Sequence, residues 1–137
     1  MLEIQTACLV AAGAVAIAFG LRYMLAREFM GYHATISGRS WGELPVGMQA
    51  IILGMYTIMG GGFATYGAAL LWLLLPLRDG QPWAALAILT LSVTALVPVV
   101  YVTVWLRSVN PEARTPVLPA VVVLVLACAG AGLSLLR

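Results

Sequence analysis

The sequence predicts an all-α protein, an integral membrane bundle of four transmembrane helices. Of its 137 residues, 63% are hydrophobic, and the mean hydropathy is +1.04. Only 9% are charged, against about 25% in soluble domains, so the chain cannot cover a water-facing surface. The apolar residues form four runs, each close to or above the roughly 20 residues needed to cross the hydrocarbon core.

The four predicted spans are residues 4–25, 46–75, 82–106 and 116–136. The connections between them are too short for a separate soluble domain, so residues 1–137 are expected to form one transmembrane domain. Short connections also favour an up-down bundle in which consecutive helices are neighbours.

The second span is the longest run and carries three glycines in its middle, Gly60 to Gly62. A broken helix in lipid would leave backbone groups unpaired at a cost of several kcal/mol each, so the helix is expected to continue through them. Pro76 is expected to end this helix, and Pro82 suits the first position of the next one.

Two faces of small residues suit close helix packing. Ala12, Ala16 and Gly20 recur every four residues in the first span. The second span carries a seven-residue repeat, which we call the outer glycine stripe: Gly47, Gly54, Gly61 and Ala68. The stripe is expected to pack against another helix rather than lipid.

The first loop, residues 27–44, is too polar to span a membrane and too aromatic for a disordered linker. This composition favours a segment lying at the membrane interface. Ser40 and Glu43 have capping-box spacing, which predicts a short helical turn before Pro45.

Arginine placement predicts the orientation. Five arginines belong to the end of the bundle with the first and third loops: Arg22, Arg27, Arg39, Arg107 and Arg114. The opposite end carries only Arg78 and Arg137. The positive-inside rule therefore places these two loops in the cytoplasm and both termini outside.

The sequence contains few residues that could take part in catalysis, metal binding or proton transfer. No span has an ionisable group near its centre, which argues against a proton-coupled transporter. A metal site would need several ligand residues at a characteristic spacing, and the chain has only one histidine, so no metal site is expected. No catalytic residue is assigned, and no cofactor is expected. Cys8 and Cys128 are expected at different depths and unpaired. A net charge of +2 gives no reason to expect nucleic acid.

One candidate ligand site remains, where the first loop meets the ends of the first two spans. Its residues are Arg22, Arg27, His33, Arg39, Gln49 and Tyr56. Antiparallel helices are expected to place Arg22 and Gln49 near one level, giving a cationic rim above a polar groove that suits an anionic headgroup. Plain anchoring at the interface would use the same residues, so both interpretations stay open.

Several short stretches carry a resemblance: FMGYH from residue 29, Trp41, the triple glycine, and PLRDGQPWA from residue 76. In these the chain resembles a group of uncharacterised bacterial four-helix membrane proteins that are distantly similar to DoxX-like proteins. The resemblance implies four helices and a bacterial cytoplasmic membrane, and it implies no activity.

Two functions fit the sequence. The first is a non-enzymatic accessory or interaction subunit with a membrane protein partner or a second copy of the chain, forming a homo-oligomer, because small-residue faces occur without buried ionisable groups. The second is a protein that binds membrane lipids or another small molecule, as a transporter or lipid-modifying enzyme.

Overall fold

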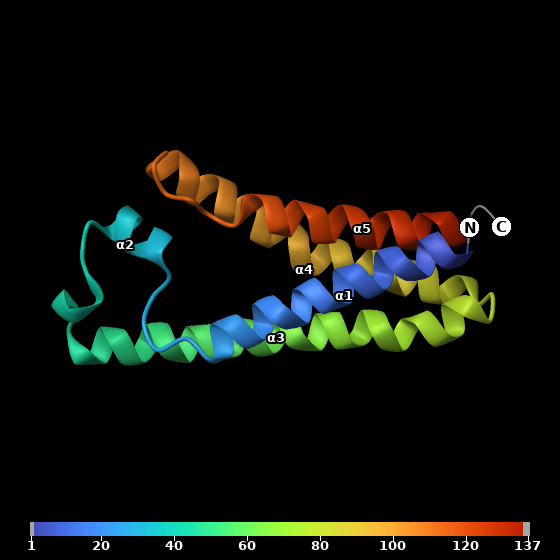
Figure 1. Ribbon diagram of the computed structural model, residues 1–137, viewed down its shortest axis with the longest axis horizontal. Coiled ribbons are helices and arrows are strands. Elements are labelled where there is room, and N and C mark those ends of the chain that lie inside the picture. Colours follow the sequence, from blue (N-terminus) through green and yellow to red (C-terminus); the bar gives the residue numbers. More distant parts are fainter. Residues whose placement is uncertain (1, 136–137) are drawn as a thin grey trace.

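The computed structural model describes residues 2–135, and its regular secondary structure there is entirely helical. The elements are α1 (Leu2–Met24), α2 (Gly31–Ser37), a 3-10 helix (Trp41–Glu43), α3 (Val46–Arg78), α4 (Pro82–Val109) and α5 (Val117–Leu135) (Figure 1). The helices α1, α3, α4 and α5 are long and apolar enough to cross a membrane. The all-α prediction with four transmembrane helices is therefore confirmed.

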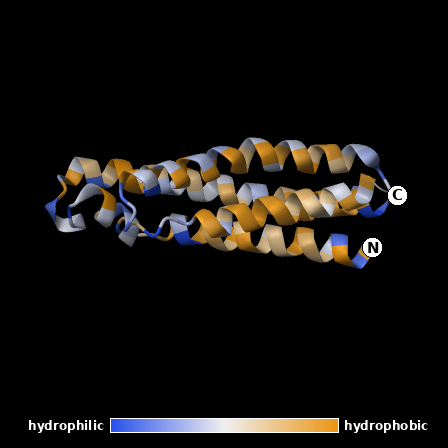
Figure 2. Ribbon diagram, turned by 90° about the horizontal axis from the view of Figure 1, so that it is seen from above, coloured by the Kyte–Doolittle hydropathy of each residue, from blue (hydrophilic) through white to orange (hydrophobic). Residues whose placement is uncertain are grey.

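The four long helices form two antiparallel hairpins, α1 with α3 and α4 with α5 (Figure 1). Helix α1 contacts both α3 and α5, and α4 packs mainly on α5 with few contacts to α3. We call the end with the α3–α4 turn the closed end, and the end with α2 and the α4–α5 connection the loop end. Coloured by hydropathy, the long helices are mostly hydrophobic, and hydrophilic residues gather toward the ends (Figure 2).

Helices α1 and α3 approach closely through two pairs of glycines. A Cβ added to Gly20 would lie 2.6 Å from the carbonyl oxygen of Gly60, and one added to Gly67 would lie 2.6 Å from that of Gly13. No side chain fits at such distances, so the glycines let the two backbones touch. We call these two pairs the α1–α3 glycine seam.

The packing face expected on the first span is confirmed, since Ala12, Ala16 and Gly20 are all buried. The outer glycine stripe, by contrast, does not pack against another helix within residues 2–135. A Cβ added to Gly47, Gly54 or Gly61 would meet nothing within 4 Å. The stripe therefore makes no close contact within this chain.

Ala68, the fourth member of the outer glycine stripe, is also exposed. The stripe lies one position along α3 from the seam residues Gly60 and Gly67, a rotation of about 100° around the helix. The seam thus uses a different face of α3. Packing of the stripe against a second chain stays a prediction.

Helix α3 runs without interruption through Gly60 to Gly62, as expected, but it does not end at Pro76. A proline removes its own donor and crowds the preceding turn, whereas residues beyond it can still donate upstream. Here the Asp79 amide donates to the Leu75 carbonyl over 3.2 Å, and the helix continues to Arg78. Pro82 does begin α4, and Trp41–Glu43 forms the turn expected before Pro45.

Helix α3 has 33 residues, or about 50 Å at 1.5 Å per residue. This exceeds the hydrocarbon thickness of about 30 Å. Because Gly20 lies opposite Gly60, the last turns of α1 lie beside the middle of α3. The first turns of α3 therefore extend past α1 at the loop end, beneath the first loop.

Candidate functional site

Helices α3 and α4 meet at the closed end and diverge toward the loop end (Figure 1). A buried hydrogen bond of 2.8 Å joins the Tyr66 hydroxyl of α3 to the Ser92 hydroxyl of α4. One turn farther toward the loop end, Phe63 and Leu96 line a cavity of about 690 Å³, which we call the large cavity. The Tyr66–Ser92 bond therefore lies just below its inner end.

The walls of the large cavity are almost wholly apolar. Helix α3 contributes three methionines, Met48, Met55 and Met59, and α4 contributes Val99 and Val102 among others. Methionine is flexible and polarizable, and it adapts to irregular shapes. Met55 is 58% exposed, so the cavity reaches the surface of the protein at this residue.

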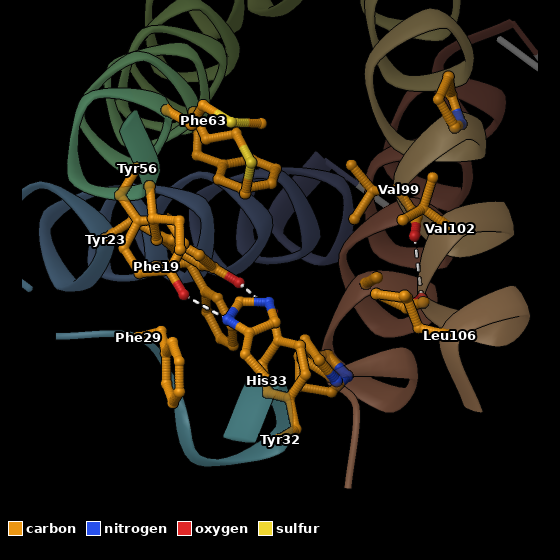
Figure 3. A pocket seen from close by; sticks show the side chains of 18 of the residues that line it. Phe19, Tyr23, Phe29, Tyr32, His33, Tyr56, Phe63, Val99, Val102 and Leu106 are labelled. Atoms are coloured by element: carbon orange, nitrogen blue, oxygen red, sulfur yellow. Dashed lines mark hydrogen bonds between the residues drawn. The ribbon is translucent and has the colours of Figure 1, made fainter. Parts of the chain in front are cut away.

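Helix α2 covers the loop end of the large cavity. Figure 3 shows Tyr32 and His33 pointing from α2 toward Tyr23 and Tyr56 of the long helices. The Tyr32 and Tyr23 hydroxyls are 2.8 Å apart, and Tyr56 is hydrogen-bonded to His33 Nδ1.

A further hydrogen bond holds α2 from the α4 side. The Asn110 side-chain amide at the end of α4 donates to the Thr35 carbonyl over 2.9 Å. Helix α2 is thus attached to both sides of the opening between the hairpins.

The hydroxyl of Tyr56 makes two hydrogen bonds to the first loop. The Met30 amide donates to it over 3.1 Å, and it is also hydrogen-bonded to His33 Nδ1. A neutral imidazole can donate or accept at this nitrogen, depending on its tautomer. Burial lowers the pKa of His33 below its usual value, which keeps the ring neutral at pH 7.

Aromatic rings support this arrangement. Tyr23 and Tyr56 are in edge-to-face contact with centroids 5.1 Å apart, and Phe29 and Trp41 make a similar contact at 5.3 Å. Such pairs contribute about 0.5–1.5 kcal/mol beyond their buried area. Burial also raises the pKa of Tyr32, so its hydroxyl stays protonated and polar without charge.

The structure brings together only part of the predicted ligand site. His33 and Tyr56 are bonded to each other and line the large cavity. Arg22 lines a smaller neighbouring cavity. Arg27 and Arg39 line neither cavity, and all three arginines are exposed.

Gln49 has a structural position instead. Its Nε2 donates to the carbonyls of Trp41 and Leu44 over 3.0 and 3.1 Å, which fastens the first loop to α3. The expectation that Arg22 and Gln49 share one level is wrong. Because Gly20 lies opposite Gly60, Arg22 is level with about residue 58, roughly 13 Å from Gln49 along α3.

One charged residue of the site was missed from the sequence. The smaller cavity, of about 320 Å³, is lined by Arg114 together with Arg22 and Tyr32; we call it the small cavity. Arg114 lies in the α4–α5 connection, and its sequence neighbours carry no signal that this loop approaches the end of α1. Only the order of helices around the bundle brings them together.

Within residues 2–135, the closed end holds no comparable group of side chains. Gln5 is buried there with no hydrogen-bond partner for either side-chain atom, and it lines neither cavity. Gly130 packs on Leu9, so Cys8 and Cys128 lie toward the same end rather than at different depths as expected, and both are free thiols. Among residues 2–135, no group of three or more potential ligands could hold a metal ion.

Comparison of the chain with protein-family models, with curated proteins and with solved structures finds no match. The geometry of the two cavities is therefore the basis for any statement about function.

Proposed function

We propose that this membrane protein binds a lipid or a similar amphipathic small molecule between its two helical hairpins. The observation that carries the proposal is the large cavity of about 690 Å³. Ligand pockets have volumes of roughly 300–1,000 Å³, with mostly apolar walls and a few polar groups that fix orientation. The large cavity has both properties.

The distribution of polar groups favours an amphipathic ligand. A polar molecule placed against Met55, Met59 and Val99 would lose its hydrogen bonds to water without replacement. The polar side chains of the lining gather toward the loop end, where His33, Tyr56 and Tyr32 are the main ones. A bound molecule would therefore direct its apolar part toward Phe63 and its polar part toward α2.

A pair of tryptophan variants tests this proposal. Val99→Trp would fill the large cavity, whereas Val97→Trp is a matched control on the same helix, because Val97 is 46% exposed and does not line it. We expect the protein extracted from membranes to carry bound lipid, detected by native mass spectrometry. Val99→Trp should reduce the bound fraction about tenfold, and Val97→Trp should leave it unchanged.

Two results would contradict the proposal. One is the absence of any bound lipid or added amphiphile in the folded wild-type protein. The other is equal occupancy in the Val99→Trp variant and its control, which would place any bound lipid outside the large cavity.

A second candidate function is that of an accessory subunit that associates with itself or with another membrane protein. The exposed outer glycine stripe supports it, since small residues on a lipid-facing surface permit close helix approach. Gly54→Leu should leave the stability of the single chain unchanged, because nothing lies within 4 Å of Gly54. Loss of cross-linked dimers in this variant would favour association, and unchanged or absent cross-linking would argue against it.

We also propose that the loop end faces the cytoplasm of a bacterial cell, with both termini outside. Five arginines support this orientation, since Arg22, Arg27, Arg39, Arg107 and Arg114 belong to the loop end and Arg78 to the closed end; Arg137 lies outside the described residues. Reporters fused to the carboxyl end test it. A reporter active only in the cytoplasm should be silent, and its activity would reverse the orientation.

A further inference from the structure

We propose that the ligand is an anionic amphiphile whose phosphate or carboxylate lies in the small cavity between Arg22 and Arg114, while its chain occupies the large cavity. This inference rests on the proposed function and adds the chemical class of the ligand. It also assigns a ligand-binding role to Arg114.

The two cavities are neighbours with a common wall. Five residues line both of them: Phe19, Tyr23, Tyr32, Pro116 and Pro119. The large cavity is apolar, whereas the small one adds two arginines. A molecule that extended past these five residues would pass from an apolar to a cationic environment within its own length.

The arginines reach the small cavity from distant parts of the chain. Arg22 belongs to the last turn of α1, and Arg114 to the connection before α5. Both side chains are exposed and both line this cavity, so an anion placed in it would be attracted by two positive charges. The planar donor pattern of arginine also matches phosphate and carboxylate oxygens.

No carboxylate among residues 2–135 lines the small cavity. Glu28, Glu43 and Glu112 belong to the same end of the molecule but line neither cavity. The Glu43 carboxylate already accepts the Ser40 amide over 2.6 Å. The anion that fits this site would therefore come from a ligand.

The position of the small cavity favours a lipid headgroup over a free anion. Arg22 lies in the last turn of a 23-residue apolar helix, which is the depth at which arginines meet headgroups. The large cavity begins on the other side of the five shared residues, so a chain attached to the headgroup and extending past them would reach it. A free phosphate would use only the smaller of the two spaces.

The test uses the full chain in phosphatidylcholine nanodiscs and four probes. Palmitoyl lysophosphatidic acid carries both chain and phosphate, and monopalmitoylglycerol carries the same chain and glycerol without phosphate. Glycerol 3-phosphate and inorganic phosphate carry the anion without a chain. Affinities are measured by titration with native mass spectrometry. We expect the wild-type protein to prefer the lysophosphatidic acid over the neutral probe by about tenfold or more, because hydrogen bonds to charged groups contribute about 1.5–3 kcal/mol.

The decisive variant is Arg22→Gln with Arg114→Gln, and its matched control is Arg27→Gln with Arg39→Gln. Both pairs remove two positive charges from the loop end, but only the first pair lines the small cavity. The first pair should abolish the preference for the phosphate probe and leave binding of the neutral probe unchanged. The control pair should keep the preference.

The outcomes separate the two proposals. Binding of both amphiphiles without preference would overturn the anionic site and leave the proposed function standing. Binding of neither would overturn both. An equal loss in the control pair would indicate general surface attraction and overturn the site. A further outcome is that glycerol 3-phosphate or inorganic phosphate binds as tightly as the lysophosphatidic acid. That result would identify a site for free anions and overturn the proposal that the ligand is an amphiphile.

Discussion

Helix α3 packs on its two neighbours in opposite ways. Against α1 it presents Gly60 and Gly67, and the two backbones touch. Toward α4 it presents Met55, Met59 and Phe63, and the helices separate around the large cavity. Small residues thus bring helices together where nothing has to fit between them, and flexible apolar residues line the place where a ligand can fit.

The largest loss of stability is expected from a methyl group added to the α1–α3 glycine seam. A Cβ at Gly60 would lie 2.5 Å from the Gly20 carbonyl oxygen and 2.8 Å from the Met24 amide nitrogen. Both are backbone atoms, so α1 and α3 must move apart. Overpacking of this kind costs about 1–3 kcal/mol, and Gly60→Ala should lower thermal stability in detergent accordingly.

The neighbouring glycine provides the control. A Cβ at Gly61 would meet nothing within 4 Å, and alanine is favoured over glycine in a helix by about 1 kcal/mol. Gly61→Ala should therefore leave stability unchanged or raise it. Equal destabilisation by the two substitutions would mean that the two faces of α3 do not differ as described.

A smaller effect is expected at the loop end, from the protonation of His33. Burial lowers its pKa in the folded protein, so the unfolded chain binds the proton first as pH falls. The stabilisation is complete above the unfolded pKa of about 6.5 and is lost as pH falls below it. Thermal stability should decline between pH 7 and 5, by at most about 1.4 kcal/mol per pH unit for one proton.

The variant His33→Gln should show a flatter profile over this range, because the chain has no other histidine. The carboxyl of Glu43 titrates at a lower pH than this range. The hydrogen bond from the Ser40 amide lowers the pKa of its carboxyl, so its contribution is lost only below about pH 4.5. A wild-type profile that is level from pH 7 to 5 would show that His33 is not held neutral by burial.

The smallest loss of stability is expected from a substitution at Tyr66, where α3 and α4 are in contact just below the large cavity. Tyr66→Phe removes the hydrogen bond to Ser92, and the freed serine hydroxyl can turn to a carbonyl of its own helix. Hydrogen bonds between membrane helices contribute about 0.6 kcal/mol on average, and the loss should be of that size. Tyr101→Phe, at a tyrosine that is 68% exposed, should change nothing; a larger loss there would contradict the assignment.

The positions of the helices could be predicted from the sequence because each apolar run is long and bounded by polar residues. The predicted span 82–106 and the observed α4 both begin at Pro82, for example. The packing face of α3 could not be predicted. The outer glycine stripe and the seam residues Gly60 and Gly67 are both seven-residue repeats, and only the position of α1 distinguishes them.

The arrangement of the candidate site could likewise be predicted only in part from the sequence. His33 and Tyr56 could be placed near each other because one loop joins the helices that carry them, and they are bonded. Gln49 lies far from the level of Arg22 because α3 begins well beyond the end of α1, an offset that antiparallel packing alone does not predict. Arg114 was missed because its approach to Arg22 depends on α5 lying beside α1.

The central place of α1 has a consequence for assembly during synthesis. Helix α1 precedes both of its partners along the chain, and chains emerge with their amino-terminal parts first. Helix α3 can therefore dock on the glycines of α1 as soon as it enters the membrane. Helix α4 makes few contacts with α3 and has to wait for α5. These contacts favour an order in which α4 and α5 dock on α1 together, so that the large cavity would form in the last step.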